Sequence, residues 1–506
     1  MSFDTSSARV FDDDVAFAMR HVSDPQISPD GSKIAYSLRW LDRGGEGVRK
    51  NAIWIMDGDG QNPRYLTAGG APRWSPDGQR LLYSSADGQG RSQLFVRTLD
   101  GSKVIQLTDG DQSPMNPVWS PDGKSVAFGR LVPESAGPLY QWPEGVKPRG
   151  EERIIKRLHH KYDGIGYLDH GYTHAFVVSA EGGEAKQLTK GLGELESKWR
   201  SVDISWSPNA QHLLVTGNFG EDAELFYDKS YIYRVNVRTG RMRQLFDDPS
   251  GTDNWHNAVY SPDGKKIAYV GKVWSDQFTY FMSHLWVADA NGENRRRLTS
   301  DLGEGVYDFK WKADSTEIYF TDGREGAYNL YSSSLTGDIT PLTTGMHFRT
   351  LNSLSDEGDA VGTYSAYKIP DDIVRFSLED AQSFQQLTNV NQEILQDVDF
   401  GGLEDIWYTT KDGARIQAWI YTPPGFDASR KYPLIVSGHG GPQSMASGAD
   451  FKTYNFRYAA EGYVVLYPNY RNSQGYGEAF MNQEDPWFPN DRTTDDIVSG
   501  VEALVE

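Results

Sequence analysis

The tetrapeptide Ser75-Pro76-Asp77-Gly78 precedes the apolar run Leu81-Leu82-Tyr83, and similar pairs of segments recur along the chain. Proline presets the backbone angle φ at the second position of a tight turn, aspartate forms local hydrogen bonds, and glycine closes the turn. The apolar run after each turn has the composition of a strand. The other copies of the turn, some of them altered, are Ser28–Gly31, Ser120–Gly123, Ser207–Ala210, Ser261–Gly264, Lys312–Ser315 and Ser355–Gly358. Each turn therefore marks one repeated β unit.

A second feature, a Leu-Thr pair after another strand-like run, recurs in the same register as the turns. The pairs are Leu66-Thr67, Leu107-Thr108, Leu188-Thr189, Leu298-Thr299, Leu342-Thr343 and Leu387-Thr388, with Leu245-Phe246 in the seventh position. Seven turns and seven pairs give units of roughly 45 residues, which is the period of a four-stranded propeller blade. A sandwich would not keep this register over so long a stretch. The sequence predicts an all-β, seven-bladed β-propeller over residues 23–394.

The spacing of the turns also predicts an insertion near residues 133–170. Ser120 and Ser207 are 87 residues apart, whereas the preceding interval is 45 residues and the following one is 54. Insertions in repeat proteins map to loops on one face, which is often the binding face. A surface loop without a binding role remains the alternative.

The pattern changes near Asp397, where strands begin to alternate with helices. Ile406-Trp407-Tyr408 and Ile416–Ile420 flank a turn and predict a hairpin. The segments that follow are a buried strand at 433–437, a helix over Thr453–Glu461, a buried strand over Tyr463–Tyr467 and a helix over Thr494–Glu506. Alternation of this kind is typical of an α/β sheet. We expect the N-terminal part of an α/β domain over residues 395–506, with a short helical segment in residues 1–22 packing on it.

The composition excludes several classes of partner and site. Lys+Arg 50 against Asp+Glu 70 gives 50 − 70 = −20, which argues against nucleic acid or an anionic membrane as a partner. The chain has no cysteine, so disulfides, thiolate catalysis and cysteine-based zinc sites are excluded. No apolar run is long enough to span a bilayer, and the first residues do not read as a signal peptide. We expect a cytoplasmic protein, with the periplasm left open.

A small-residue loop follows the first buried strand of the α/β segment. It reads Gly438-His439-Gly440-Gly441-Pro442 and comes directly after the run Tyr432–Val436. A glycine-rich turn at the end of such a strand is how an α/β-hydrolase presents a backbone N–H to the oxyanion of its reaction intermediate. The sequence therefore predicts the oxyanion loop of a serine hydrolase.

The nucleophile that should accompany this loop does not occur in the 506 residues. The elbow that exposes a catalytic serine needs Gly-x-Ser-x-Gly, and the nearest match is Arg471-Asn472-Ser473-Gln474-Gly475, with arginine at the first glycine position. We therefore interpret Ser473 as an ordinary loop serine. The order of the triad in this fold is serine, acid, histidine, and His439 is the last histidine of the sequence. We expect these 506 residues to lack a triad and to be inactive alone.

With these parts in this order, the chain resembles the prolyl oligopeptidase family of serine peptidases, and most of all its acylaminoacyl-peptidase and bacterial dipeptidyl-peptidase branch. The resemblance rests on the segments Pro25–Gly31, Tyr162–Tyr167, Asp412–Phe426, Tyr432–Pro442 and Tyr467–Gly477. It covers essentially the whole chain, and it implies that the sequence stops within the hydrolase domain, before the catalytic triad. The implied fold is an N-terminal propeller over a C-terminal α/β-hydrolase domain.

The resemblance also implies roles for single residues. Gly441 would supply the oxyanion-hole N–H, and His439 and Gly440 would shape its turn. The side chains expected to line the substrate site are Tyr470, Arg471, Tyr476, Tyr162 and Asp163. No cofactor and no metal are expected, the substrates would be short peptides, and a homo-oligomer is possible within the family.

Two functions remain open from the sequence. The first is a serine exopeptidase that removes blocked residues or dipeptides from short peptides. The second is a catalytically dead propeller scaffold that binds peptides or proteins, although such a scaffold has no need of the oxyanion loop.

Other titratable groups carry weaker signals. We interpret His159-His160 as surface residues, because adjacent side chains on a strand point to opposite faces. The stretch Asp301–Asp308 lacks the full ligand series of a calcium loop, so we expect a solvated loop there. Glu151 and Glu152 are similarly interpreted as an exposed charged face rather than a site for a peptide amino terminus.

Overall fold

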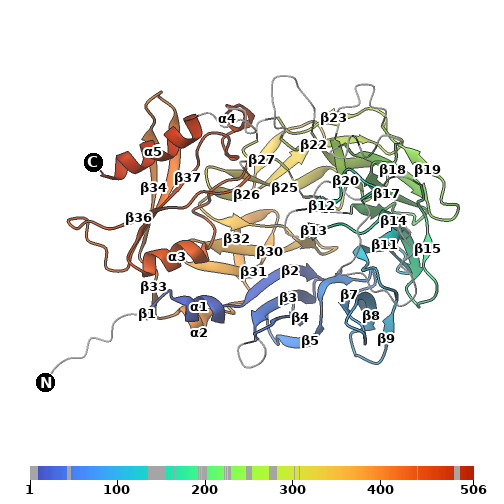
Figure 1. Ribbon diagram of the computed structural model, residues 1–506. Coiled ribbons are helices and arrows are strands. Elements are labelled where there is room, and N and C mark those ends of the chain that lie inside the picture. Colours follow the sequence, from blue (N-terminus) through green and yellow to red (C-terminus); the bar gives the residue numbers. More distant parts are fainter. Residues whose placement is uncertain are drawn as a thin grey trace, which may run out of the picture. The chain divides into compact units, whose positions relative to one another are not determined.

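The computed structural model is built mainly of strands (Figure 1). The residues it describes are 9–42, 47–134, 155–162, 166–191, 193, 195, 202–220, 223, 225, 229–246, 254–272, 282–300, 302–306, 308–441, 443–483 and 491–505. The chain divides into two compact units. Unit 1 comprises Met1–Trp74, Trp274–Leu285 and Arg297–Glu506, and unit 2 comprises Ser75–Val273 and Trp286–Arg296.

The β part of unit 1 contains a four-stranded and a nine-stranded sheet. The first sheet has the order β2 (His21–Ile27), β3 (Lys33–Leu41), β4 (Arg49–Asp57), β5 (Arg64–Ala68), and β6 (Gly70–Trp74) follows it in the chain. The nine-stranded sheet consists of β24 (Phe309–Trp311), β25 (Glu317–Arg324), β26 (Ala327–Ser334), β27 (Ile339–Pro341), β28 (Phe348–Arg349), β29 (Ser353–Leu354), β30 (Asp359–Ala366), β31 (Ile369–Ser377) and β32 (Asp380–Gln386). A single parallel pair, Tyr328 opposite Phe348, joins its two halves.

Unit 2 continues the same antiparallel pattern. Its strands are β7 (Arg80–Ala86), β8 (Ser92–Thr98), β9 (Val104–Gln106), β10 (Met115–Trp119), β11 (Ser125–Pro133), β12 (Lys161–Tyr162), β13 (Gly166–Tyr167), β14 (Gly171–Ser179), β15 (Lys186–Gln187), β16 (Ile204–Trp206), β17 (His212–Gly217), β18 (Tyr231–Asn236), β19 (Met242–Gln244), β20 (Asn254–Tyr260) and β21 (Lys266–Lys272). Two of the boundaries between the units fall within β22 (His284–Asp289) and β23 (Arg296–Arg297), and the other two follow Trp74 and Val273. The orders β10-β11-β14-β15 and β16-β17-β18-β19 each form a four-stranded sheet.

An excursion of the chain separates two neighbouring strands of unit 2. β11 pairs directly with β14, with Pro133 opposite Gly171. Residues 134–170 lie between these two strands in the sequence, and the described ones among them include the paired strands β12 and β13. The excess spacing between two of the turns in the sequence comes from this segment.

Each of the seven turn motifs leads into a strand, and the turns are held by local hydrogen bonds. In the copy at Ser75, the serine hydroxyl donates to the Asp77 carboxylate and the Gly78 N–H donates to the Ser75 carbonyl at 2.8 Å. Gly78 has φ +68°, a left-handed conformation that glycine adopts without steric strain. The strands that follow the turns are β3, β7, β11, β17, β21, β25 and β30.

Five of the six Leu-Thr pairs, all except Leu66-Thr67, bind the strand beside them through both residues. The Leu188 N–H donates to the Ala175 carbonyl at 2.8 Å, and the Thr189 hydroxyl accepts from the Ala175 N–H at 3.0 Å. Leu107-Thr108 contacts Leu94 in the same way. The pair thus replaces one step of a strand ladder by a side chain, while its leucine enters the core at 4% exposure for Leu188.

A mixed four-stranded sheet with the order β34-β35-β37-β36 forms the C-terminal part of unit 1. Its strands are β34 (Gly402–Thr409), β35 (Arg415–Thr422), β36 (Leu434–Val436) and β37 (Val464–Pro468), and its helices are α3 (Thr453–Ala460), α4 (Glu478–Met481) and α5 (Asp491–Val505). Only β36 and β37 are parallel, joined by the crossover through α3. The helices α3 and α5 cover opposite faces, because Phe456 of α3 packs with Trp419 whereas Val501 of α5 packs with Ala418 (Figure 1).

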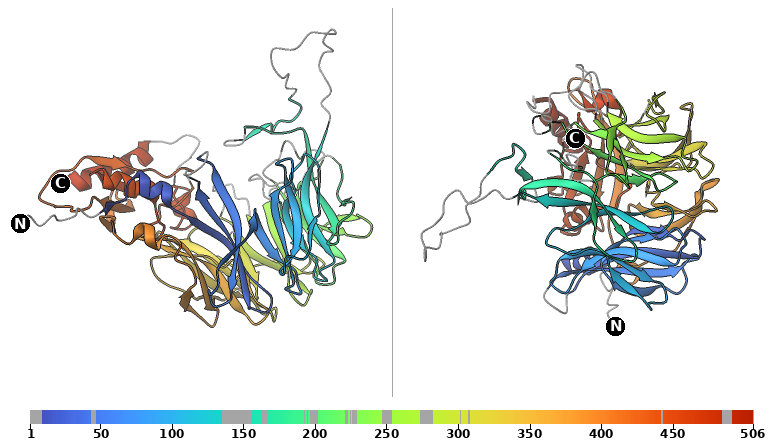
Figure 2. Two further views of the ribbon diagram at one scale, coloured as in Figure 1. Left: turned by 90° about the horizontal axis from the view of Figure 1, so that it is seen from below. Right: turned by 90° about the vertical axis from the view of Figure 1, so that its right-hand side faces the viewer.

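The segment before the first sheet packs on this mixed sheet. The helix α1 (Asp13–Ala18) is capped by the Asp12 carboxylate, which accepts the Val15 N–H at 2.8 Å. Phe11 is fully buried, and its ring centroid lies 5.7 Å from that of Phe456 on α3. Figure 2 (left) shows α1, in blue, beside these orange and red elements. Burial of these aromatic rings stabilises the packing of the N-terminal segment against the C-terminal mixed sheet.

The structure agrees with most of the expected elements and adds a few short ones. The hairpin, both strands and the last two long helices form where the hydrophobic pattern places them. The expected burial is confirmed for β37 but wrong for β36, whose Val436 is 38% exposed. The helix α2 (Gln392–Leu395), the helix α4 and the parallel pair of β1 (Arg9–Val10) with β33 (Val398–Asp399) were not expected. Single-turn helices and two-residue strands are too short to leave a periodic signal. The seven-bladed arrangement stays a prediction.

Candidate active site

The glycine-rich loop lies at the carboxyl end of the parallel strand β36. The Ser437 N–H still donates to the Leu466 carbonyl of β37 at 2.8 Å, and residues 438–441 then leave the sheet. A second loop, Asn469–Gly477, leaves the carboxyl end of β37. Because parallel strands present their carboxyl ends at one edge, the two loops lie together there. Open α/β sheets bind their ligands at this edge.

Gly441 has a backbone conformation that only glycine adopts easily. Its φ is +129°, and a Cβ atom at this position would lie 2.6 Å from the Gln443 nitrogen. A Cβ atom at Gly438 or Gly440 would meet nothing within 4 Å, so these positions face open space. The first glycine-specific requirement of the loop is therefore at Gly441.

The loop presents two backbone donors without an acceptor among the described residues. In that part of the chain, no hydrogen bond is made by the backbone N–H of Gly440 or Gly441. Both residues are exposed. Preorganised backbone N–H groups are the donors that stabilise the oxyanion of an acyl-transfer intermediate. The arrangement fits the predicted role of Gly441.

His439 connects the two loops. Its Nε2 atom lies 2.8 Å from the Ser473 Oγ atom, and its ring stacks on that of Tyr470 at a centroid distance of 4.4 Å. The Tyr470 hydroxyl donates to the His439 carbonyl. The Ser473 hydroxyl also lies 2.6 Å from the Tyr470 carbonyl. The oxyanion loop is therefore held from the second loop by side-chain and backbone contacts.

The two nitrogen atoms of the His439 ring each lie within hydrogen-bond distance of an oxygen atom, the Gly440 carbonyl and the Ser473 Oγ atom. Burial lowers the pKa of His439, although the bond between Nδ1 and the Gly440 carbonyl at 3.0 Å acts in the opposite direction. A neutral imidazole has one N–H and one acceptor nitrogen. It satisfies both contacts when Nδ1–H donates to the Gly440 carbonyl and the Ser473 hydroxyl donates to Nε2, and the lowered pKa favours this neutral form near neutral pH. The Ser473 hydroxyl has a single proton, so it then gives up its bond to the Tyr470 carbonyl.

The Ser473–His439 contact was missed by the sequence analysis, which required the histidine to follow the serine. Proximity in the fold does not depend on that order, and the two residues are 34 positions apart. Ser473 has no exposed surface, so a substrate carbonyl has no access to its Oγ atom. The contact positions the loop, and the interpretation of Ser473 as a residue without a nucleophilic role is retained.

Arg471 is held inside the protein. It is 3% exposed, and its guanidinium bonds to Asp496, which has no exposed surface, at 2.6 Å, and to Asp412 at 2.6 Å. Asp496 belongs to α5 and Asp412 to the turn between β34 and β35. Its guanidinium therefore fastens the second loop to two elements, and its predicted role in lining the substrate site stays a prediction.

Tyr476 and Tyr470 are also held by neighbouring groups. The Tyr476 hydroxyl donates to Gln417 on β35 and accepts from the Asn469 amide at 2.7 Å. The Asn469 side chain in turn accepts the Ala446 N–H at 2.6 Å. The loop after Gly441 is thus tied to the loop after β37, and the role of both tyrosines in lining the substrate site stays a prediction.

The remaining predicted site residues either belong to unit 2 or lie outside the described residues. Tyr162 belongs to unit 2, where its ring lies 5.0 Å from that of His159. Asp163, Glu151, Glu152 and Pro442 lie outside the described residues. His160 stacks on Tyr167, and no group of three His, Asp or Glu side chains in the described part of the chain is arranged to hold a metal.

The prediction of a solvated loop over Asp301–Asp308 is wrong for residues 302–306, which the structure describes. Leu302 is 3% exposed and Val306 is fully buried. The Asp322 carboxylate, which is 1% exposed, accepts the backbone N–H groups of residues 303–305 and holds the segment against β25. Asp322 lies 17 to 19 residues away in the sequence, so no local motif predicts this partner.

The chain is similar to known peptidases over nearly its whole length. Residues 8–135 match the family described as TolB beta propeller domain. The dipeptidyl-peptidase 5 of Porphyromonas gingivalis is 28% identical over 484 residues, which are 92% of this chain and 68% of that protein. The uncharacterized peptidase YuxL of Bacillus subtilis is 27% identical over 492 residues, covering 93% of this chain and 72% of that protein.

A solved structure has the same fold. The acylaminoacyl peptidase of Pyrococcus horikoshii superposes with a TM-score of 0.77 at 20% sequence identity, over 98% of this chain and 72% of that one. Together these similarities confirm the resemblance to the serine peptidases of the prolyl oligopeptidase family. None of the described helices has the length and apolar character needed to cross a membrane.

Proposed function

We propose that this chain is part of a serine exopeptidase that removes dipeptides or blocked residues from short peptides. The serine-peptidase resemblance is supported by the relatives, whose names describe dipeptidyl and acylaminoacyl peptidases. Dipeptidyl and acylaminoacyl peptidases both act at the amino terminus of a peptide, and we propose the same kind of cleavage for this chain.

The observation that carries the proposal is the loop at the end of β36. Gly441 holds a left-handed conformation, and the N–H groups of Gly440 and Gly441 point to no acceptor in the described residues. An acyl-enzyme mechanism needs such donors 2.7 to 3.1 Å from the developing oxyanion. A scaffold that only binds partners has no use for them.

The role of the β region follows from the same resemblance. We propose that its seven sequence repeats close into a seven-bladed propeller. This propeller would act as a size filter that lets only short peptides reach the catalytic site. Contacts between the first and the seventh sequence repeat support this proposal. The Asp356 N–H donates to the Pro29 carbonyl at 2.9 Å, and the Ile27 N–H donates to the Ser353 hydroxyl at 2.8 Å.

The 506 residues contain no Gly-x-Ser-x-Gly segment and no histidine after His439. We propose that these residues alone do not hydrolyse peptides, and that the nucleophile, acid and base come from outside them. The short peptides are the only partners the proposal requires, and it places the protein in the cytoplasm, with the periplasm as the alternative.

The test is an intact-mass measurement on the protein isolated from its native source, with labelling of the same preparation by a fluorophosphonate. We expect a polypeptide longer than 506 residues that reacts with the probe and releases dipeptides or acylated residues from short peptides. A polypeptide of 506 residues that does not react would overturn the proposal and favour a binding scaffold.

The contribution of the loop is tested in the reactive protein by Gly441→Ala, with Gly440→Ala as the matched control. The added methyl group must displace the backbone at Gln443 in the first variant, whereas it meets nothing in the second. Loss of one oxyanion donor lowers kcat by about 10²–10³, and we expect that loss only for Gly441→Ala. Equal activities would remove Gly441 from the proposed role.

A further inference from the structure

A two-residue turn of the β region lies against the loops of the candidate active site. The strands β25 and β26 pair up to Arg324 opposite Ala327, so the turn consists of Glu325 and Gly326 alone. Their φ angles are +47° and +82°. Positive φ at both central residues is typical of a type I′ turn, in which asparagine and glycine are preferred. A glutamate in this conformation is unusual and has to be held there by its surroundings.

The surroundings hold the turn by its backbone. The Glu325 N–H donates to the Gly475 carbonyl at 3.2 Å, and the Gly326 N–H donates to the Met445 Sδ atom at 3.2 Å. The Ser447 hydroxyl donates to the Gly326 carbonyl at 2.5 Å. The Glu325 side chain is exposed, whereas Gly475, Met445 and Ser447 are buried. The contacts of the backbone, rather than those of the glutamate side chain, therefore define the conformation of the turn.

The turn also fits closely against its neighbours. A Cβ atom at Gly326 would lie 2.3 Å from the Trp419 Cζ2 atom, so any side chain there must displace the ring or the turn. Trp419 is 2% exposed, and its Nε1–H donates to the Ala446 carbonyl at 3.0 Å. A Cβ atom at Gly475 would similarly lie 2.2 Å from the Met445 Sδ atom. We call the residues around the turn the turn socket: Trp419, Met445, Ser447 and Gly475.

The hairpin reaches Gly475 by a second route as well. The Asp322 carboxylate on β25 accepts the backbone N–H groups of residues 303–305. The Gly303 carbonyl in turn accepts the Gly475 N–H at 2.9 Å. Both backbone groups of Gly475 are therefore bound, one by the turn and the other by a segment that the hairpin holds.

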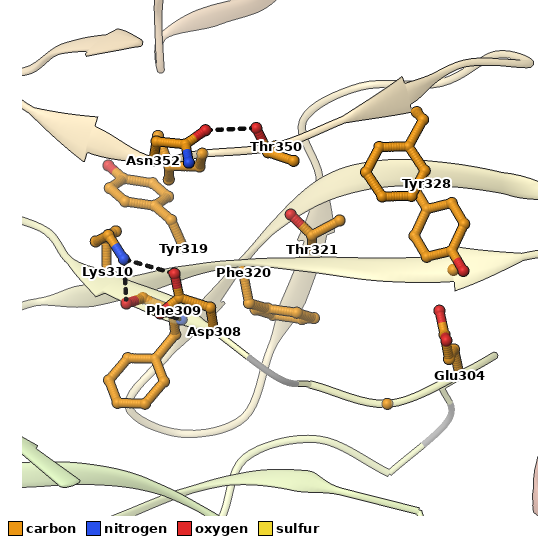
Figure 3. A pocket seen from close by; sticks show the side chains of 14 residues that line it. Glu304, Asp308, Phe309, Lys310, Tyr319, Phe320, Thr321, Tyr328, Thr350 and Asn352 are labelled. Atoms are coloured by element: carbon orange, nitrogen blue, oxygen red, sulfur yellow. Dashed lines mark hydrogen bonds and ion pairs between the residues drawn. The ribbon is translucent and has the colours of Figure 1, made fainter. Parts of the chain in front are cut away.

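The other strand of the hairpin holds the same segment beside a cavity of 240 Å³ (Figure 3). At one end of this cavity the Glu304 side chain and the Tyr328 hydroxyl point toward one another, and the two groups are hydrogen-bonded. Gly323 lies opposite Tyr328 in the pair of strands. A Cβ atom at Gly323 would lie 2.5 Å from the Glu304 Oε2 atom and 3.1 Å from the Met445 Cε atom, so glycine leaves the space for both side chains.

The turn socket belongs to both loops of the candidate active site. Met445 and Ser447 follow Gly441 by four and six residues, and Gly475 follows Ser473, the partner of His439, by two. The turn therefore contacts the continuation of the oxyanion loop and the loop after β37 at the same time. Oxyanion donors stabilise an intermediate only when they are held in place before the reaction.

We propose that the Glu325–Gly326 turn is a positioning element for the reaction of the peptidase, because its backbone fixes the two loops relative to one another. The inference rests on the proposed function. The turn acts through Met445, Ser447 and Gly475 and needs no contact of its own with the substrate.

The first experiment follows amide hydrogen exchange by mass spectrometry in the 506-residue chain, so it does not depend on a catalytic triad. Gly326→Ala places a methyl group against Trp419, and Ser447→Ala removes a hydroxyl from the turn without a clash. The matched control is Gly358→Ala, because Gly358 has φ +90° but a Cβ atom there meets nothing within 4 Å. We expect faster exchange over residues 443–449 and 469–477 in the first two variants and no change there in the control.

The second experiment measures kcat and KM of the same variants in the polypeptide that reacts with the fluorophosphonate. Titration with this probe to completion counts the reactive sites, so a loss of folded protein does not lower kcat per site. A misplacement of about 1 Å by a change outside the reacting groups costs about 100-fold in rate, and we expect a fall of this size in kcat for Gly326→Ala. Ser447→Ala should show a smaller fall. KM should stay unchanged, as for an interaction made only in the transition state.

Several outcomes would overturn the inference and leave the peptidase proposal intact. They are unchanged exchange of both loops in folded Gly326→Ala and Ser447→Ala, an unchanged kcat per site in both variants, and an equal loss in Gly358→Ala. A native polypeptide that does not react with the probe would instead overturn the proposed function, and with it the role of the turn in catalysis. The exchange experiment would then still decide whether the turn holds the two loops.

Discussion

The repeated β units and the mixed α/β segment are held together over very different distances in the sequence. In a turn such as Ser28–Gly31, the hydrogen bonds join residues two to five positions apart, for example the Ser28 hydroxyl to Asp30 and the Lys33 N–H to Ser28. In the α/β segment, Arg471 reaches Asp412 at a separation of 59 residues. Local bonds form whatever the rest of the chain does, whereas distant ones require the tertiary fold. The first kind is readable from a motif and the second is not.

The two regions also differ in how much stability is lost when one of their hydrogen-bonded or ion-paired groups is removed. The turn motifs are repeated, and their aspartates are exposed although the serine that opens most of them is buried, so we expect the loss of one aspartate to be tolerated. Arg471 and Asp496 are buried, and removal of one partner leaves a charge without compensation in a low-dielectric environment. The substitutions below therefore separate the two regions by the size of their effects.

The largest effect is expected from Arg471→Met, because it strands the buried Asp496 carboxylate and frees the loop that carries Ser473. We expect the free energy of unfolding of the 506-residue chain to fall by about 3–5 kcal/mol, measured by urea denaturation. The control is Arg457→Met, which removes an ion pair to Asp13 that is 43% and 62% exposed and should change stability by about 0–1 kcal/mol. Similar losses in both variants would contradict the assigned role of Arg471.

A smaller effect, with a defined pH dependence, is expected at Asp372 in β31. Burial raises the pKa of this 2% exposed carboxyl to about 6. Below about pH 4 the folded and unfolded chains both hold the proton, so the group has no net effect. Between pH 4 and 6 the unfolded chain loses the proton first, and stability falls as the pH rises. Asp372→Asn should abolish this fall, which is worth up to about 3 kcal/mol.

The matched comparison for that experiment is Asp30→Asn in the first turn. The Ser28 hydroxyl lowers the pKa of Asp30, so its contribution is present above the unfolded pKa and is lost as the pH falls through the folded one. The sign is opposite to that at Asp372. Stability measured from pH 3 to 8 by thermal unfolding should show the two slopes in opposite directions, and slopes of the same sign would be incompatible with the assigned surroundings.

An intermediate loss is expected from Thr189→Val in one Leu-Thr pair. The Thr189 hydroxyl accepts the buried Ala175 N–H, and valine keeps the shape but leaves that donor unsatisfied, which costs about 1–3 kcal/mol. The control is Thr67→Val, because the Thr67 hydroxyl donates only to the Ala68 carbonyl at 3.3 Å and supports no neighbouring strand. Chemical denaturation should show no comparable loss in the control.

The smallest effects are expected at the last position of two turns. Gly264 has φ +71° and room for a methyl group, with Pro208 at 3.6 Å, so Gly264→Ala should lose only the preference of glycine for this conformation, about 1 kcal/mol. In the altered turn, Ala210 already has φ +56°. Ala210→Gly should be neutral to slightly stabilising, since relief of the strain is offset by a more flexible unfolded chain. Thermal unfolding that shows both variants equally destabilised would contradict a common turn geometry.

Much of the fold was readable from the sequence for one reason: the signals are local. The proline, aspartate and glycine of each turn act within five residues, and the apolar runs of 433–437 and 463–467 predict buried strands by composition alone. The Leu-Thr pairs were recognised as repeats, but their purpose was not, because the acceptor role of Thr189 depends on Ala175 in a neighbouring strand.

The candidate site divides in the same way. The glycine at 441 is required by backbone geometry, so the oxyanion loop was predictable from the residues that form it. The contact of His439 with Ser473 was not predictable, since it joins the ends of two parallel strands across a helical crossover. The contact of Glu304 with Tyr328 was not predictable either, because Glu304 lies in a loop and Tyr328 on β26, 24 residues later.

The sequence by itself determined where the turns, strands and the glycine-rich loop begin, because a local backbone preference is a property of a few adjacent residues. Only the tertiary structure decided which side chains meet. It placed Arg471 between Asp412 and Asp496, His439 against Ser473, and Glu304 beside Tyr328 at the end of a cavity. Burial at these contacts sets charge and proton affinity, and burial depends on the packing of distant segments.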